Sequence, residues 1–167
     1  MVMKLIFIYC IWSISFNSIN TNTLLFYIQR NLNSNIVVYK ANFDTAGILI
    51  KDNPIKSYWV MNSQNGKIEP LSFIEKKMAY GIKCIPTNVK NQYKVQLVAD
   101  KNHSFVLKQQ DPFKAMITTV IDGITIKLTS FYVEADNSSI WPKVQFIIIE
   151  GTELESNKII TKKLYFN

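Results

Sequence analysis

Apolar and polar residues alternate with a period of two along most of the chain. In ITIKLT, residues 124–129, three aliphatic side chains alternate with two threonines and a lysine. The segment QYKVQL, residues 92–97, repeats the pattern. Because successive side chains of a β-strand point to opposite faces, this alternation predicts half-buried strands. It is typical of antiparallel sheets that pack one face on a core.

Turn signals separate these alternating segments. Asp122-Gly123 and Asn65-Gly66 tolerate the positive backbone angles of a tight hairpin turn. Turns of this kind recur roughly every 8–12 residues. We therefore predict about ten strands, near residues 24–30, 35–43, 55–62, 81–86, 92–100, 104–110, 115–122, 124–135, 144–150 and 158–166.

One segment breaks the alternation and indicates a helix. In EPLSFIEKKMAYG, Ser72 is followed three residues later by Glu75, which is the spacing of a capping box. We predict one short helix near 72–80 that lies on the sheet or plugs an open end. Its apolar face would carry Leu71, Ile74 and Met78.

Together these elements predict an all-β, mainly antiparallel fold. We expect a single β-meander that forms a barrel or a sandwich of about ten strands with the one short helix. Strand count and spacing do not separate the barrel from the sandwich. The absence of a repeat or a linker predicts that residues 21–167 form a single β-rich domain.

The first twenty residues have the pattern of a cleavable signal peptide. Lys4 precedes the apolar run LIFIYCIWSI, residues 5–14, and SFNSIN follows with small and polar residues. A run of this length is too short to span a bilayer, so we predict no transmembrane segment in the mature chain. We expect an exported protein, periplasmic or secreted. The alternative is that this run is a buried strand or helix of the core.

The charge balance is mildly basic. Lysine and arginine outnumber aspartate and glutamate by 19 to 12, a net +7, and loss of Lys4 would leave 18 against 12, or +6. The basic residues are scattered singly, which together with export argues against nucleic acid as a partner. Attraction to anionic lipid or polysaccharide surfaces and simple solubility explain the excess equally well. A patch of lysines is conceivable from Lys108, Lys114, Lys127 and Lys143.

The sequence lacks the residue groups that most catalytic chemistry needs. His103, the sole histidine, lies in a predicted turn, so neither a metal cluster nor a Ser–His or Cys–His pair is indicated. Cys84 would be the only cysteine of the mature chain, in an apolar context that predicts an inert thiol and no internal disulfide. No glycine-rich loop predicts a phosphate site, and we expect no cofactor. Carboxylates for a hydrolase exist, but the sequence does not pair them: Asp44, Glu69, Glu75, Glu134 and Glu150.

Three strings resemble a known family. LFYIQRNLNSNIVVYKANFD, NPIKSYWV and IEKKMAYGIK are similar to segments of the domain of unknown function 4833 family, small exported proteins mainly of Bacteroidota. The resemblance implies export and one compact domain, and it brings no activity. It draws attention to possible ligand-binding positions: Tyr27, Gln29, Arg30, Tyr39, Tyr58, Trp59 and Tyr80. In the same way, DTA at residues 44–46 resembles an acceptor for O-linked sugars, with Thr45 as the attachment point.

Arg30, the only arginine, is the most specific of these candidates. Alternation places Phe26, Ile28 and Arg30 on one face of the first strand. A guanidinium among aromatic side chains is suited to hold a carboxylate or a phosphate by paired hydrogen bonds. The alternative is structural, with Arg30 capping a barrel mouth or pairing with Asp44.

These features predict a non-enzymatic cell-envelope module that binds a small apolar or anionic ligand or a protein partner. If the strands close into a barrel, Phe26, Ile28, Tyr58 and Arg30 would line its mouth. Two alternatives stay open. One is an envelope hydrolase whose carboxylates the fold would bring together in a cleft with raised affinity for protons. The other is a purely structural or assembly protein with an exposed apolar patch.

Overall fold

The computed structural model describes residues 23–100, 103–136, 138 and 143–166. These residues form eleven strands, one α-helix and a short 3-10 turn. The strands are β1 Leu24–Arg30, β2 Ile36–Ala41, β3 Ile55–Met61, β4 Lys67–Pro70, β5 Ile82–Pro86, β6 Gln92–Leu97, β7 Phe105–Asp111, β8 Lys114–Ile121, β9 Ile124–Asp136, β10 Lys143–Glu153 and β11 Ile159–Tyr165. The helix α1 spans Phe73–Met78, and the 3-10 turn η1 spans Asn62–Gln64. None of the helical segments in this described part is long and apolar enough to cross a membrane.

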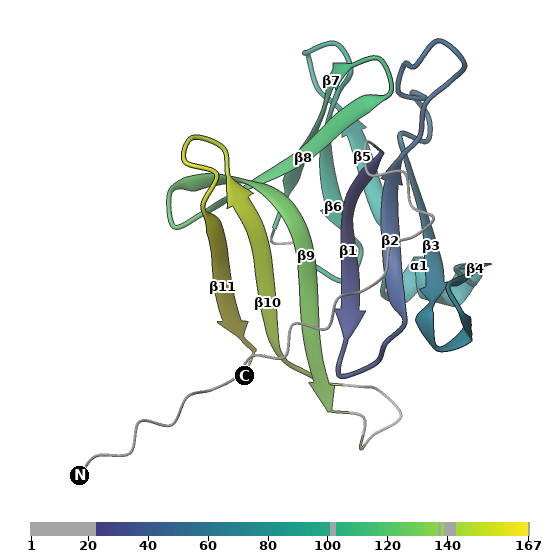
Figure 1. Cartoon of the computed structure of the whole chain (residues 1–167), viewed down its shortest axis with the longest axis vertical. Coiled ribbons are helices and arrows are strands. Elements are labelled where there is room, and N and C mark those ends of the chain that lie inside the picture. Colours follow the sequence, from purple (N-terminus) through teal and green to yellow (C-terminus); the bar gives the residue numbers. More distant parts are fainter. Residues whose placement is uncertain (1–22, 101–102, 137, 139–142, 167) are drawn as a thin grey trace.

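All eleven strands belong to one curled sheet. Its order is β4-β3-β2-β1-β9-β8-β7-β6-β5, and the hairpin of β10 and β11 adds to the other edge of β9. The sheet curls into a half-barrel, so that β5, β6 and β7 lie behind β1 and β2 (Figure 1). The strands at the two ends of this order, β4 and β5, are joined in the chain by α1.

The all-β, mainly antiparallel prediction is confirmed, and ten of the eleven strands lie where the alternation placed them. Strand β4 was missed because it has only four residues and ends in a proline, which sequence patterns seldom assign to a strand. The meander is interrupted at one place, where β1 and β9 pair in parallel. The outcome is neither a closed barrel nor a two-sheet sandwich.

Strand β9 makes this topology possible because it is long enough to pair with two strands, β8 and β1, along one edge. Its first residues pair with β8, and residues Ser130 to Val133 pair with β1. Asn31 extends the parallel pairing beyond β1: its side-chain amide donates to the Ala135 carbonyl at 3.0 Å and accepts from the Ala135 N–H at 2.8 Å. This side chain therefore replaces a peptide group of the ladder, a pairing that alternation alone does not indicate.

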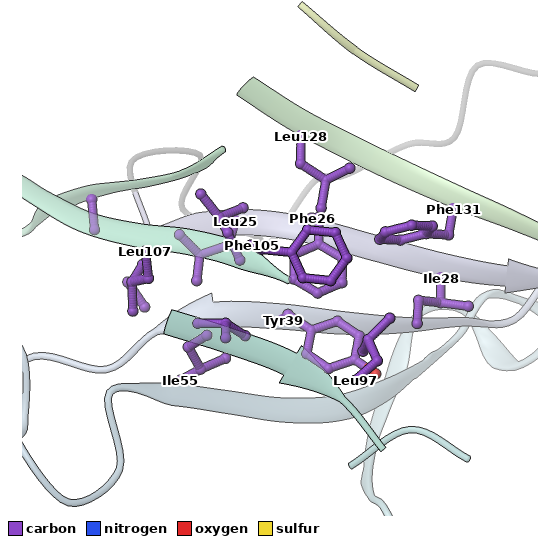
Figure 2. Packing of buried hydrophobic residues seen from close by; sticks show 14 of the residues in the cluster. Leu25, Phe26, Ile28, Tyr39, Ile55, Leu97, Phe105, Leu107, Leu128 and Phe131 are labelled. Atoms are coloured by element: carbon purple, nitrogen blue, oxygen red, sulfur yellow. The ribbon is translucent and has the colours of Figure 1, made fainter. Parts of the chain in front are cut away.

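Aromatic side chains fill the concave side of the sheet (Figure 2). The rings of Phe26 and Tyr39 stack with centroids 4.3 Å apart. Phe131 packs edge-on against Phe26 at 5.7 Å and against Phe105 at 5.6 Å. Because Phe26 and Phe105 lie on strands of the two facing halves, β1 and β7, the ring of Phe131 joins both halves of the core. The interior of the half-barrel is thus packed with side chains.

Candidate functional site

Helix α1 lies between the two end strands of the sheet and begins with the predicted capping box. The Ser72 N–H donates to Glu75 Oε2 at 2.7 Å, and the Glu75 N–H donates to Ser72 Oγ at 3.3 Å. These two bonds satisfy backbone groups that the first turn of a helix leaves unpaired. The sequence-based helix start is therefore confirmed.

Glu75 also links the helix to the sheet. The indole Nε1 of Trp59 in β3 donates to Glu75 Oε1 at 3.0 Å. Burial works to raise the pKa of Glu75, but the hydrogen bonds from Ser72 and Trp59 outweigh it and hold this pKa below its ordinary value. The carboxylate is thus kept ionised, and each of its two oxygens accepts a hydrogen bond.

Tyr80 completes the attachment of α1. Its ring packs edge-on against Trp59 with centroids 5.3 Å apart. The buried hydroxyl of Tyr39 donates to the Tyr80 carbonyl at 2.7 Å. Burial raises the pKa of the Tyr80 hydroxyl, while the positive charge of Arg30 and a hydrogen bond from its guanidinium act in the opposite direction. Four of the predicted positions, Arg30, Tyr39, Trp59 and Tyr80, therefore meet in one cluster.

Gly81 allows the chain to turn closely beneath the helix. A Cβ at this position would lie 1.8 Å from the carbonyl oxygen of Lys76. The Gly81 carbonyl also accepts from the Val98 N–H at 2.8 Å, which continues the ladder between β5 and β6. Only a residue without a side chain fits between the helix end and this ladder.

An open cleft of about 620 Å³ lies beside this cluster. The β1–β2 turn contributes Asn33 and Asn35, and the end of β4 leads to Ser72 and Glu75 on the helix side. The floor and walls are completed by Trp59, Met61, Glu69, Pro70 and Leu71. The cleft thus combines amide groups, apolar surface and two carboxylates.

The predicted ligand-binding residues divide between the cleft and other places. Trp59 alone lines the cleft, and Arg30, Tyr39 and Tyr80 support it through the cluster behind. Gln29 supports the opposite wall because its Nε2 donates to the Asn33 carbonyl at 2.8 Å. Whether any of these residues binds a ligand stays a prediction.

Tyr27 and Tyr58 lie on the convex face, away from the core. Both pack around a small cluster formed by Ile36, Val38 and Val60. Burial raises the pKa of each of the two hydroxyls. Alternation had placed Tyr27 opposite Phe26, and the structure agrees. The mouth that we expected from Tyr58 together with Arg30 is not formed, because Tyr58 packs on the outer face.

The alternative pairing of Arg30 with Asp44 is wrong. Ala41 binds Thr23 before the start of β1, so Asp44 lies beyond that end, whereas Arg30 is the last residue of β1. Seven strand residues separate the two ends by roughly 20 Å. Asp44 instead accepts from the N–H groups of Ala46 and Ile48 at 2.9 and 2.8 Å.

Thr45 lies exposed in the turn that Asp44 organises. It is accessible there, and its modification stays a prediction. The turn belongs to the loop between β2 and β3, which is fastened by the buried Asn42, whose Nδ2 donates to the Asn53 carbonyl at 2.8 Å.

The cleft residues that sequence reasoning missed include two from the β1–β2 turn. Asn33 lies in RNLNSN between two predicted strands, and Asn35 was placed at the start of the strand predicted near 35–43. Glu69 was noted as a carboxylate but had no partner in sequence. Only the curl of the sheet brings this turn opposite α1, so no local pattern could have indicated it.

Of the two features expected of a hydrolase, carboxylates in one cleft and a raised pKa, only the first is found in the described part of the chain. Glu69 and Glu75 share the cleft, yet the pKa of Glu75 is lowered, whereas the hydrolase hypothesis expected raised proton affinity. Burial raises the pKa of the Cys84 thiol to about 11, which agrees with an unreactive cysteine. His103 Nδ1 lies 2.6 Å from Asp100, and among the described residues no three His, Cys, Asp or Glu side chains are grouped to hold a metal.

The apolar side chains of α1 point to solvent. Phe73 is 77% exposed, Ile74 71% and Met78 55%. Of the predicted apolar face, only Leu71, just before the helix, is buried. The physical reason is that Glu75 and Tyr80 fasten the helix by its polar and C-terminal side, which turns the remaining faces outward. We call Phe73, Ile74 and Met78 the α1 patch.

A comparison of the chain with protein families gives a match, which covers nearly all of the sheet. The family described as domain of unknown function (DUF4833) matches residues 26–163. The chain belongs to this family. The DUF4833 match starts within β1 and ends within β11, so it includes the α1 cluster, the cleft and the parallel pairing. No curated protein and no solved structure matched the chain.

Proposed function

We propose that this DUF4833 protein is a non-enzymatic binding module of the cell envelope, and that its partner is a protein that covers the α1 patch and enters the adjoining cleft. The observation that carries the proposal is the orientation of α1. The helix is fixed to the sheet by Glu75 and Tyr80, while its three largest apolar side chains are exposed.

An exposed patch on a rigid element is typical of a protein interface. Full burial of a Phe, Ile or Met side chain lowers the free energy by about 1.5–3 kcal/mol. The free protein does not gain this stabilisation at the α1 patch, and a partner that covers the patch would provide it. Leu32 is another exposed apolar residue, at 93% exposure. It is next to Asn33, which lines the other side of the cleft. Apolar side chains on both sides of a cleft favour a partner that spans it.

The cleft itself favours a protein segment over a small anionic or apolar ligand. Both ionised groups that line it, Glu69 and Glu75, are acidic, which opposes binding of an anion there. The interior of the half-barrel is filled by Phe26, Tyr39 and Phe131, which leaves no room for an apolar ligand among these rings. Asn33 and Asn35 offer side-chain amides of the kind that bind a partner's backbone.

Crosslinking in intact cells of the native host tests the proposal. We expect a protein that is recovered with the wild type and lost with Phe73→Ser/Ile74→Ser, and that binds the purified wild type directly. The matched control is Val120→Ser/Ile159→Ser, which removes two equally exposed apolar side chains (63% and 68%) far from α1. The proposal fails if both double variants recover the same proteins, or if a panel of fatty acids, sugar phosphates and glycans raises the melting temperature instead.

The envelope location is part of the proposal and has its own test. The predicted signal peptide lies outside the described residues. We expect the mature protein isolated from the host to begin near residue 21, as measured by intact mass. Recovery of the uncleaved chain from the cytosol would contradict this location without affecting the interface.

A further inference from the structure

The lysines that looked scattered in sequence gather on the convex side of one half of the sheet. Strands β5 to β9 direct their apolar residues, such as Val95 and Leu107, into the core, so the intervening residues face outward. Five exposed outward positions are lysines: Lys83, Lys94, Lys108, Lys114 and Lys127. Lys114 lies at the edge, 4.0 Å from Asp111, and we call the other four the basic face.

The strand register fixes how close these lysines are. Lys94 lies diagonally from both Lys83 and Lys108, one strand across and two residues along, which corresponds to roughly 8 Å between Cα atoms. Along one row the register runs from Lys94 through Val106 and Thr118 to Lys127. That row spans three strand spacings, or roughly 14 Å. Lys83, Lys94 and Lys108 therefore lie within about one Debye length of their nearest neighbour and reinforce each other's potential, whereas Lys127 lies farther along the same face.

Acidic residues lie at the borders of the basic face: Glu150 of β10 pairs with Ser130 of β9, close to the Thr152–Lys127 pair. Strands β5, β6 and β8 contain none, and Asp111 of β7 lies at a turn 4.0 Å from Lys114. Asp122 pairs with Lys162 of β11 at 2.7 Å. Among the described residues, no ion pair is found for the four lysines of the basic face. The patch considered from sequence is thus corrected: Lys108 and Lys127 belong to the basic face, Lys114 lies at its edge beside Asp111, and Lys143 lies opposite Asp136 at the far end of β9.

The residues between the lysines indicate what kind of anion fits. Six are uncharged hydrogen-bonding side chains, Gln92, Gln96, Gln110, Thr118, Thr125 and Thr129, and four are apolar, Ile85, Val106, Met116 and Val120. No aromatic residue occupies an outward position of β5 to β8 or of the first half of β9. Stacking on nucleic-acid bases and insertion of aromatic anchors into a bilayer are therefore not supported. Point charges spaced among amides and hydroxyls suit an extended chain that carries both acid groups and hydroxyls.

We propose that the basic face binds an acidic polysaccharide, with the lysines paired to its carboxylates and the glutamines and threonines hydrogen-bonded to its hydroxyls. This surface lies on the convex side of β5 to β9, apart from the α1 patch. The protein can therefore bind a partner through the α1 patch while its basic face is bound to an anionic glycan layer.

Binding of the purified protein to polygalacturonate, measured by calorimetry at physiological salt, tests the proposal. We expect Lys94→Glu/Lys127→Glu to weaken binding roughly tenfold or more. The matched control is Lys56→Glu/Lys158→Glu, which changes the net charge equally at exposed lysines outside the face. The control should bind like the wild type, and higher salt should weaken binding of both.

Four results would overturn the proposal. These are no binding of polygalacturonate, equal loss in the two double variants, equal binding of neutral dextran, or stronger binding of anionic phosphatidylglycerol vesicles or single-stranded DNA than of the glycan. Both double variants must keep the wild-type melting temperature within about 2 °C, because exposed substitutions cost little stability. If folding of Lys94→Glu/Lys127→Glu is impaired, the corresponding Lys→Gln pair replaces it.

Discussion

At the scale of single residues, the fold depends on side chains that form hydrogen bonds with backbone groups in place of other backbone groups. Asn31 continues the ladder between β1 and β9 with its amide, and Glu75 satisfies the first turn of α1 while it accepts from Trp59. Such residues cannot be exchanged for similar ones, because each makes bonds of fixed geometry to two elements. The capping box of Ser72 and Glu75 could be predicted since it is local. The bond to Trp59, sixteen residues away, could not.

The first prediction concerns Glu75 and pH. Because its pKa is lowered in the folded state, the stability it contributes is present above its ordinary pKa and is lost as the pH falls through the lower, folded value. We expect Glu75→Gln to cost about 1 kcal/mol at pH 7 and to flatten the loss of stability between about pH 5 and pH 3. Urea unfolding at a series of pH values measures this. Glu155→Gln, at an exposed turn, should keep the wild-type slope, and an unchanged slope in Glu75→Gln would contradict the assigned role.

At the scale of elements, the helix shows how anchoring overrides amphipathic pattern. Leu71, Ile74 and Met78 share one predicted face, yet only Leu71 is buried, at 4% exposure. Gly81 holds the helix end close to the ladder of β5 and β6, and Tyr80 fixes its rotation. Two turns of helix have too little surface for their own apolar stripe to decide their orientation. The contacts at the ends decide it instead.

The second prediction separates the buried and exposed apolar residues of this element. We expect Leu71→Ala to cost about 2–4 kcal/mol, since it leaves a cavity under the helix. Phe73→Ala should change the free energy of unfolding by about 0.5 kcal/mol or less, because its side chain is 77% exposed. Chemical denaturation of the two variants compares them. Equal losses would show that Phe73 packs on the protein and would remove the main support for the interface.

At the scale of the whole molecule, one long strand connects two antiparallel halves. β9 pairs with β8 and β1 along the same edge, and Phe131 on this strand contacts the rings of Phe26 and Phe105 in the two halves. Covalent order alone would leave β1–β4 and β5–β8 as neighbouring meanders. Because a parallel pair and a shared aromatic core connect them, we expect the two meanders to unfold as one cooperative unit.

The third prediction follows from that connection. Phe131→Ala should cost about 3–5 kcal/mol. The variant should still unfold in a single transition, with tryptophan fluorescence and far-ultraviolet circular dichroism giving the same midpoint. Ile159→Ala, at a position 68% exposed, serves as the control and should change little. Two separate transitions in the wild type would show that the halves fold independently.

The sequence by itself determined ten of the eleven strands, their facing residues and the start of the helix, because alternation and capping depend on neighbours a few residues apart. It also placed Arg30 on the same face as Phe26, as the structure has it. Only the tertiary structure decided that β1 pairs with β9, that α1 exposes its apolar side chains, and that four separate lysines share one face. Each of these depends on which distant strands become neighbours when the sheet curls, and many pairings satisfy the same local pattern equally well.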